Sequence, residues 1–173
     1  MNKTLIQLSL QGNQICAQGG EALDEALKVN NILNQLDLSW NQISVRGGEA
    51  LAESLKTNNT LTHLQRNEIS AYGDEALAEA LKVNNTLIQL NLQGNGICAE
   101  GGEALKVNKT LAQLNLRRNK VSDRGNEALA EALASSNILT QLDLSWNHIS
   151  DRGGEALAEA LAFNNILTHL DLS

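Results

Sequence analysis

The nine residues from Leu33 to Asn41, LNQLDLSWN, decide the fold, because variants of them recur from one end of the chain to the other. The leucine that leads each copy stands 28, 28, 26, 24, 28 and 28 residues after the one before it. A nearly constant period of this size is the signature of a repeat array. These leading positions are Leu5, Leu33, Leu61, Leu87, Leu111, Leu139 and Leu167.

The first half of each unit has the pattern of a β-strand. Between Gln35 and Ser39, apolar and polar residues alternate, so the leucines face one side and the polar residues the other. Successive units run in the same direction and predict parallel strands, because each crossover is long enough to return the chain to the same edge. Such crossovers are right-handed.

The second half of each unit has the pattern of a helix. In residues 47–56, GGEALAESLK, alanines and leucines recur at helical spacing, and the charged residues lie off that face. We expect Gly47 and Gly48 to open the helix with unusual backbone angles, and Asn58 and Asn59 to end it in a left-handed conformation. Strands lie about 4.8 Å apart and packed helices about 8–10 Å apart, so the stack must curve with its strands inside.

The strand pattern LxxLxLxxNxI and the helical tail ALAEALKxN resemble those of the leucine-rich-repeat family, in its longer ribonuclease-inhibitor-like subtype. The tail is also similar to the repeat region of nucleotide-binding leucine-rich-repeat receptors. The resemblance covers nearly the whole chain and implies an α/β solenoid. It is expected to form a curved, horseshoe-like arc with a parallel β-sheet on the concave face and helices on the convex face. The resemblance also implies protein–protein recognition on the concave face.

The repeats predict one domain over residues 1–173, with six repeats and a partial seventh. The boundaries are 5–32, 33–60, 61–86, 87–110, 111–138, 139–166 and 167–173. No linker interrupts this array, and repeat proteins bury their core along a line, unit on unit.

Two repeats are short. In the third, counting forward from Leu61 puts Arg66 at an inward leucine position, whereas counting back from Asn67 puts Thr62 there. Both counts predict a local defect in the core or in strand pairing. The fourth repeat lacks four residues in its helical half, at 101–106, and four residues are about one helical turn. Its helix is expected to shrink to a single turn or a 3₁₀ segment.

The sequence begins just before a strand and ends within one. Repeat arrays usually need polar caps, and bare sheet edges invite pairing. Two expectations follow: the sequence is a fragment of a longer protein, or its uncapped ends associate with one another.

Composition narrows the function classes. A net charge of −7 argues against nucleic acid, whose phosphates would be repelled. Much of the acidic charge comes from glutamate pairs that are expected on the outer, solvated helical face: Glu49/Glu53, Glu75/Glu79, Glu127/Glu131 and Glu155/Glu159. The sequence shows neither a signal peptide nor a run of about 18 apolar residues, so it predicts no membrane insertion. Cys16 and Cys98 occupy the same column three repeats apart, too far apart for a disulfide. Free buried thiols predict a reducing compartment and a cytoplasmic location.

One asparagine per repeat follows the strand. A buried polar residue amid leucines is costly without partners, and a carboxamide offers two donors and an acceptor. The column is therefore predicted to be structural, bonding backbone groups at the bend after each strand. It consists of Asn13, Asn41, Asn67, Asn95, Asn119 and Asn147.

Polar columns on the strands are the candidate protein-binding surface. They would form a polar face with two tryptophan anchors and a basic spot, since Trp and Arg are frequent at binding hot spots. The candidate residues are Gln35, Asp37, Ser39, Trp40, His63, Arg66, Gln89, Asn91, Gln113, Asn115, Arg117, Arg118, Gln141, Asp143, Ser145 and Trp146.

Structural roles compete with this interpretation. The glutamines would form an amide ladder in which each side chain bonds to its neighbour. The tryptophans would pack over the strand ends. Arg117 would form an ion pair with Asp143 in the next repeat, of a kind worth about 0–1 kcal/mol.

Catalysis has little support in the sequence. His63 and His169 fall four repeats apart, and His148 stands in a loop beside Asp151 without other converging groups. Phosphate-binding loops, zinc-protease motifs and Cys/His clusters are absent from the sequence. We therefore predict no enzyme activity, no cofactor and no metal.

The sequence favours a non-catalytic interaction module that binds a protein or peptide on its concave face. Two alternatives remain open. One is a regulatory fragment that acts on an enzyme in trans, as a GTPase-activating protein or as an innate-immune-receptor sensor. The other is a structural segment that assembles through its uncapped ends.

Overall fold

The computed structural model describes residues 2–30, 32–58, 60–98, 101–135 and 138–173. Within these residues, seven short strands alternate with six helices. They are β1 (Gln7–Ser9), α1 (Ala17–Leu27), β2 (Gln35–Asp37), α2 (Ser44–Leu55), β3 (Leu61–His63), α3 (Ser70–Val83), β4 (Gln89–Asn91), α4 (Gly101–Val107), β5 (Gln113–Asn115), α5 (Asp123–Ser135), β6 (Gln141–Asp143), α6 (Asp151–Leu161) and β7 (His169–Asp171).

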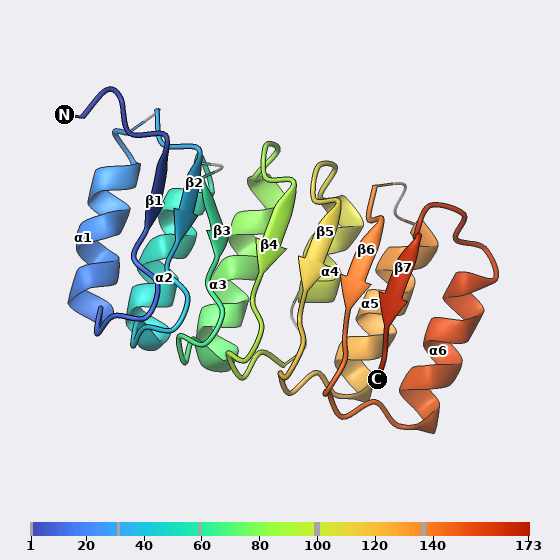
Figure 1. The fold of residues 1–173 in the computed structure, drawn as a ribbon. Coiled ribbons are helices and arrows are strands. Elements are labelled where there is room, and N and C mark those ends of the chain that lie inside the picture. Colours follow the sequence, from blue (N-terminus) through green and yellow to red (C-terminus); the bar gives the residue numbers. More distant parts are fainter. Residues whose placement is uncertain (1, 31, 59, 99–100, 136–137) are drawn as a thin grey trace.

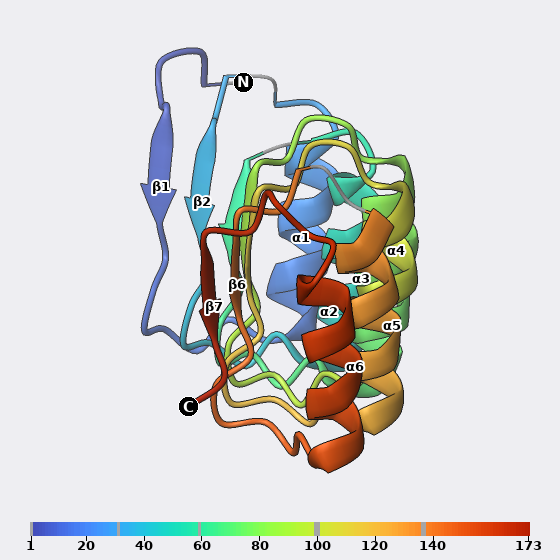
Figure 2. The same cartoon turned by 90° about the vertical axis from the view of Figure 1, so that its right-hand side faces the viewer.

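The strands form one sheet in sequence order, and every neighbouring pair is parallel. All six helices lie on one side of this sheet, so the molecule has two layers (Figure 2). In Figure 1 the row of helices extends beyond the row of strands at both ends, as expected when wider helices back narrower strands. The predicted fold, a leucine-rich-repeat solenoid with strands on the inner face, is confirmed.

The core fills the space between the two layers. The alternation predicted for the strands is observed in β2, where Leu36 is fully buried between half-buried Gln35 and Asp37. Leucines of α2, such as Leu51 and Leu55, are equally buried. One apolar cluster joins the described repeats, which is the continuous core of a stacked array.

The predicted asparagine column forms a ladder of hydrogen bonds that is buried from Asn41 to Asn119, as Asn119 illustrates. Its Nδ2 donates to the carbonyls of Leu92 (3.0 Å) and Leu116 (2.8 Å). Its Oδ1 accepts from the amides of Asn95 (2.9 Å) and Ile97 (3.1 Å). One side chain thus satisfies four backbone groups of adjoining repeats, as the structural interpretation requires.

A second asparagine ladder runs along the other end of the strands and corrects the expectation for Asn58. This residue does not end α2 in a left-handed conformation. It is buried, and its Nδ2 donates to the carbonyl of Leu27 in the previous repeat (3.1 Å), while its Oδ1 accepts from the amide of Thr60 (2.7 Å). Asn84 and Asn108 repeat the arrangement. Asn59 lies outside the described residues.

The glycine pair also has a different role from the one expected. Gly47 and Gly48 lie inside α2 and do not have positive φ. A Cβ on Gly47 would lie 2.7 Å from a methyl carbon of Ile43 and 3.1 Å from the backbone Cα of Ala17 in α1. These glycines are therefore needed for the close approach of side chains and neighbouring helices, rather than for backbone freedom.

The third repeat has the predicted defect in strand pairing. Leu36 pairs with Leu61 and Asp37 pairs with His63, so the register shifts by one residue and Thr62 is the extra residue of a bulge. The bulge lets Leu61 occupy the inward position, so neither Arg66 nor Thr62 replaces a core leucine. In Figure 2, β1 and β2 are swung away from the later strands at this junction.

The fourth repeat is shortened in its helix, as predicted, but less than expected. α4 has seven residues, which is about two turns, so the expectation of a single turn or a 3₁₀ segment is wrong. Lys106 of α4 bonds to Glu103 (2.7 Å) and to Glu131 of α5 (2.5 Å). These bonds raise the pKa of Lys106 above its ordinary value.

The thiols are more accessible than expected. Cys16 is exposed and Cys98 is half-buried, and both are free, so the expectation of buried thiols is wrong. None of the helices in the described part of the chain is long and apolar enough to cross a membrane.

Candidate functional site

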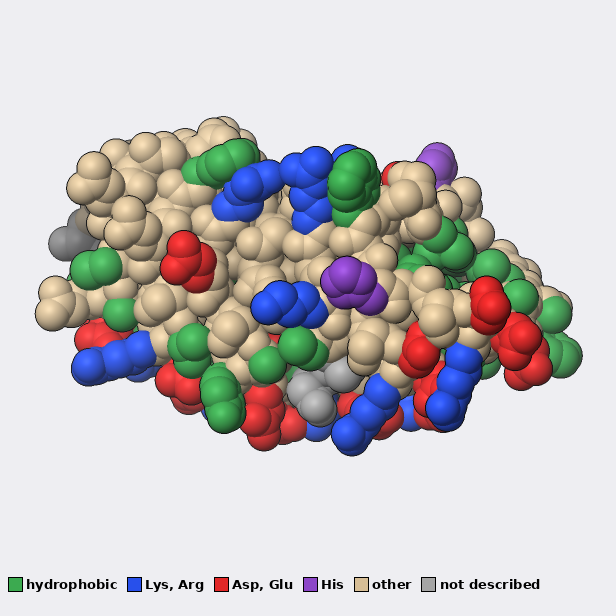
Figure 3. All heavy atoms as spheres, turned by 90° about the horizontal axis from the view of Figure 1, so that it is seen from below, with side chains coloured by type: hydrophobic (Ala, Val, Ile, Leu, Met, Phe, Trp, Pro, Cys, Tyr) green, Lys and Arg blue, Asp and Glu red, His purple; other side chains and the backbone are tan. Residues whose placement is uncertain are grey.

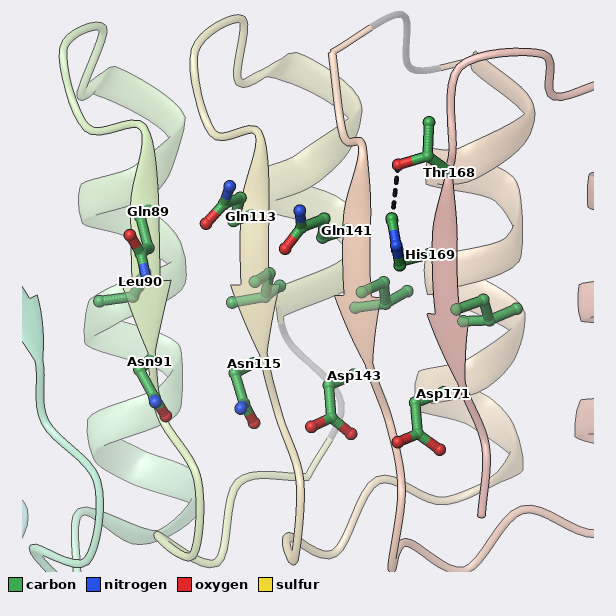
Figure 4. Close-up of a pocket in the computed structure, with 13 residues that line it drawn as sticks. Gln89, Leu90, Asn91, Gln113, Asn115, Gln141, Asp143, Thr168, His169 and Asp171 are labelled. Carbon is green, nitrogen blue, oxygen red and sulfur yellow. Dashed lines mark hydrogen bonds between the residues drawn. The ribbon is translucent and has the colours of Figure 1, made fainter.

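The sheet carries a wide hollow over strands β4 to β7, with a volume of about 620 Å³. Its polar lining comes from the outward positions of these strands, and Figure 4 shows the rows of carboxamides and carboxylates that each strand adds. The polar residues of the lining are Gln89, Asn91, Gln113, Asn115, Gln141, Asp143, Thr168, His169 and Asp171. Six of them were predicted binding residues.

The glutamine column forms only part of the proposed amide ladder. Nε2 of Gln7 donates to Oε1 of Gln35 (2.9 Å). Over the hollow, no hydrogen bond joins Gln89, Gln113 and Gln141 to one another among the described side chains. Their amides project from the sheet face (Figure 4). These carboxamides therefore offer donors and acceptors to a ligand.

A second polar column, two residues after the glutamines on each strand, is held rigidly by the backbone. Oδ1 of Asn91, Asn115 and Asp143 each accepts from the amide two residues farther along, at 2.9–3.1 Å. Asp37 makes the same bond to Ser39 (2.9 Å). A side chain whose carbonyl or carboxylate oxygen is fixed in this way presents its remaining polar atom in a defined direction.

Two predicted contact residues must be corrected. Ser39 and Ser145 are fully buried, because the chain bends after the strand and the preceding aspartate lies over each serine. The hydroxyl of Ser145 donates to Oδ1 of Asp143 (2.6 Å), and the hydroxyl of Ser39 donates to Asp37. These serines support the aspartates and cannot touch a partner directly.

The carboxylate of Asp171, which lines the hollow, accepts hydrogen bonds from Ser173. Hydrogen bonds from the backbone and side chain of Ser173 lower the pKa of Asp171, and the positive charge of Arg117 lowers it further. Both effects stabilise the charged form, so the hollow carries negative charge at neutral pH.

The histidines do not converge. His63 lies on β3 and His169 on β7, with three strands between them. Each ring is held by the hydroxyl of the preceding threonine, at 2.7 Å from Thr62 and 2.9 Å from Thr168 to Nδ1. This arrangement orients the rings on the sheet face, and catalytic constellations require groups that meet at one point.

A second feature, which we call the turn ridge, lies where the chain leaves each strand. All six residues of this column have a left-handed backbone, with φ between 51° and 71°. Two are glycines, which adopt this conformation freely, whereas for a larger residue it costs about 1–3 kcal/mol. The turn ridge consists of Gly12, Trp40, Arg66, Gly94, Arg118 and Trp146.

The tryptophans and arginines of the turn ridge form pairs across adjacent repeats. The guanidinium carbon of Arg66 lies 4.2 Å from the ring centroid of Trp40, and that of Arg118 lies 4.8 Å from the ring centroid of Trp146. Trp40 and Trp146 remain 52% and 61% exposed. The structure therefore disfavours the alternative in which the tryptophans pack over the strand ends.

The ion pair considered for Arg117 is not formed. Among the described residues, no carboxylate of Asp143 lies within ion-pair distance of Arg117, and Asp143 bonds instead to Ser145. Figure 3 shows Lys and Arg side chains grouped with two hydrophobic side chains along one border, while most acidic side chains gather along the opposite border.

Sequence reasoning missed the pairing within the turn ridge. The four large residues were among the predicted contacts, but their backbone conformation was not predicted. Gly12 and Gly94 were the available signal, since a glycine that recurs at a turn often marks positive φ. The Arg–Trp contacts depend on the side chains projecting from that conformation, which residue spacing does not reveal.

Comparisons with known proteins agree with the observed architecture. The family description "leucine-rich repeat" matches residues 2–23, 29–52, 83–106, 107–130 and 135–158. The solved structure of leiomodin-1 actin-binding site 2 matches with a TM-score of 0.58 and 19% identity, over 94% of this chain and 82% of that one.

A second solved structure, of a protein from Bacteroides fragilis, has a TM-score of 0.39 and 13% identity, over 99% of this chain and 66% of that one. A search of curated protein sequences found no match. The family matches cover more than half of the residues, and each spans one strand–helix unit. The chain therefore belongs to the leucine-rich-repeat family.

Proposed function

We propose that this chain is a non-catalytic interaction module whose concave sheet face binds a protein or peptide. The observation that carries the proposal is the polar hollow. Gln89, Gln113 and Gln141 present their side-chain amides over it, and no hydrogen bond joins these three amides to one another. Small-molecule sites are mostly apolar and enclosed. A polar hollow across four strands suits the backbone and side chains of another polypeptide.

The proposed contact residues combine the hollow with the turn ridge and the neighbouring strands. They are Gln35, Asp37, Trp40, His63, Arg66, Gln89, Asn91, Gln113, Asn115, Arg117, Arg118, Gln141, Asp143 and Trp146. The similarly folded leiomodin-1 structure is described as an actin-binding site, which is an example of protein binding on this fold.

Finer assignments are part of the same proposal. We place the chain in the ribonuclease-inhibitor-like subtype, supported by helices of 11–14 residues in α1, α2, α3, α5 and α6. The free thiols Cys16 and Cys98 support a reducing, cytoplasmic environment. The continuous sheet and core support a single domain.

Site-specific photocrosslinking tests the proposal. A benzophenone amino acid in place of Gln113 puts the crosslinker in the hollow, and the matched chain carries it in place of Gln18, an exposed glutamine of α1. In an extract of the native source, position 113 is expected to give a discrete protein adduct that excess unlabelled chain abolishes. Position 18 is expected to give none.

Gel electrophoresis followed by mass spectrometry measures both outcomes. The same adduct at position 18 alone would place recognition on the helical side. Adducts of equal intensity at both positions, unaffected by the competitor, would mean non-specific contact. Either result would contradict a binding site on the concave face.

A further inference from the structure

The turn ridge shows a mirrored order of side chains. Along the chain it reads Gly, Trp, Arg, Gly, Arg, Trp, so the two arginines lie inside and the two tryptophans lie outside. Gly94 stands between Arg66 and Arg118, and the stem of Arg66 leans over it, since a Cβ on Gly94 would lie 3.2 Å from Cγ of Arg66. The ridge therefore carries two guanidiniums in its middle, each stacked on an indole of the adjacent outer repeat.

Backbone hydrogen bonds fix the spacing between the backbones of Arg66 and Arg118. The amide of Arg66 donates to the carbonyl of Gln93, and the amide of Gly94 donates to the carbonyl of Arg117, both at 2.9 Å. The parallel pairing therefore continues through the turn ridge, and successive rungs keep the strand spacing of about 4.8 Å. The backbones of Arg66 and Arg118, two rungs apart, are thus about 10 Å apart.

Stacking prepares both guanidiniums to bind an anion. Arg66 lies over Trp40 and Arg118 over Trp146, and an arginine on an aromatic face keeps the N–H groups of its planar edge available. Such an edge matches a carboxylate or phosphate with two parallel hydrogen bonds. The stacking also holds each side chain in place, which reduces the ordering cost of binding.

The charges of the turn ridge are not neutralised within the described residues. On the helical side, Arg46 pairs with Glu21 and Arg152 pairs with Glu127. Neither Arg66 nor Arg118 has a carboxylate within ion-pair distance in the described part of the chain. A protein of net charge −7 thus leaves two pre-oriented arginines open on one edge.

We propose that the turn ridge binds an acidic peptide segment with two carboxylates flanked by apolar residues. Alternate residues of an extended peptide project on one face about 6.8 Å apart, and glutamate side chains span the remaining distance to both guanidiniums. Flanking apolar side chains contact the exposed indoles. The inference rests on the proposed function, because it names the chemistry of a segment of the partner.

The cations and aromatic rings of the turn ridge are also groups that bind nucleic acids. The acidic peptide is favoured because a long polyanion meets the net negative charge of the whole chain, whereas a peptide with two charges meets mainly the local arginines. The screening length of about 8 Å in physiological salt keeps the distant glutamates out of range.

Tryptophan fluorescence tests the proposal, since the chain has two tryptophans and both belong to the turn ridge. The full chain is titrated with LEGEL, acetylated and amidated so that its charges are the two glutamates. We expect a saturable change in emission with Kd on the order of 0.1–1 mM, weakened at least about tenfold with the uncharged peptide LQGQL.

The matched variants are Arg66→Gln with Arg118→Gln, and Arg152→Gln on the helical side, with folding checked by circular dichroism. The double variant is expected to weaken LEGEL binding at least about tenfold, and Arg152→Gln to leave it within about twofold. Equal responses to LEGEL and LQGQL, or equal affinities of the double variant and the unaltered chain, would overturn the proposal.

Two further outcomes are decisive. Tighter binding of a thymidine trinucleotide, which carries two phosphates, would replace the acidic peptide by nucleic acid. A discrete adduct at position 113 together with unchanged tryptophan emission would overturn the acidic-peptide assignment and leave the concave-face function standing. Absence of an adduct at position 113 would instead contradict the proposed function.

Discussion

Gly102→Ala is expected to lower the free energy of unfolding by about 3 kcal/mol, at the upper end of the range for overpacked cores. A Cβ at this position would lie 2.5 Å from Cβ of Ala128, 2.6 Å from its carbonyl carbon and 2.8 Å from the amide nitrogen of Leu129. Two of these are backbone atoms, which cannot rotate away. α4 and α5 would have to separate, which would weaken the contact between the fourth and fifth repeats.

Gly154→Ala is the matched control. Gly154 occupies the same column two repeats later, and no atom lies within 4 Å of its added Cβ. Alanine is favoured over glycine in a helix by up to about 1 kcal/mol, so this variant should be neutral or slightly more stable. Urea unfolding followed by circular dichroism measures both. Equal stabilities for the two variants would mean that α4 and α5 do not approach as closely as the structure shows.

Asn119→Ala is expected to cost about 3–5 kcal/mol, because each backbone group left unpaired in a buried site costs about 1–3 kcal/mol and part of the loss is relieved by water. The change removes the partner of two amides and two carbonyls in the buried ladder. A loss of this size should lower Tm by roughly 6–20 °C in a chain of this length.

Asn13→Ala is the control for the ladder. Asn13 is exposed and donates to two carbonyls of its own turn, at 2.9 and 3.3 Å. Its loss is expected to cost less than about 1 kcal/mol, since water replaces those bonds. Scanning calorimetry compares the two variants. An Asn119→Ala variant as stable as Asn13→Ala would show that the ladder contributes little to the stack.

The repeat pattern predicted the sheet, the helices and the first asparagine ladder because each depends on periodicity. A leucine such as Leu36 must face inward wherever the alternation holds, and parallel pairing follows from uniform direction. The deletion in the third repeat could not be placed from the sequence. The structure resolves it with a bulge at Thr62, which is chosen by packing rather than by residue spacing.

Three features required atomic geometry. Ser39 stands at an alternating outward position, yet the bend after β2 buries it beneath Asp37. Asn58 reads as a helix end, yet it bonds across to the preceding repeat. Gly102 and Gly154 occupy one column, yet only the former meets a close neighbour, because α5 packs beside α4 whereas no described helix follows α6. Local pattern does not encode distances between neighbouring repeats.

The candidate site was predicted in part. Alternation placed Gln89, Gln113 and Gln141 on one face, and the structure brings them together over the hollow. The alternation in the sequence did not reveal that Arg66 and Arg118 stack on tryptophans from adjacent repeats. Such contacts depend on the left-handed backbone of the turn ridge, which larger residues adopt rarely.

The most direct test of the concave-face assignment measures how tightly two charge variants of the chain bind the partner. This partner is the protein that crosslinks at position 113. Gln113→Arg puts a bulky cation in the hollow, and Gln18→Arg makes the same chemical change on the exposed side of α1. Isothermal titration calorimetry should show at least about a tenfold loss for Gln113→Arg and a change within about twofold for Gln18→Arg. Unchanged affinity for Gln113→Arg with a large loss for Gln18→Arg would contradict binding on the sheet.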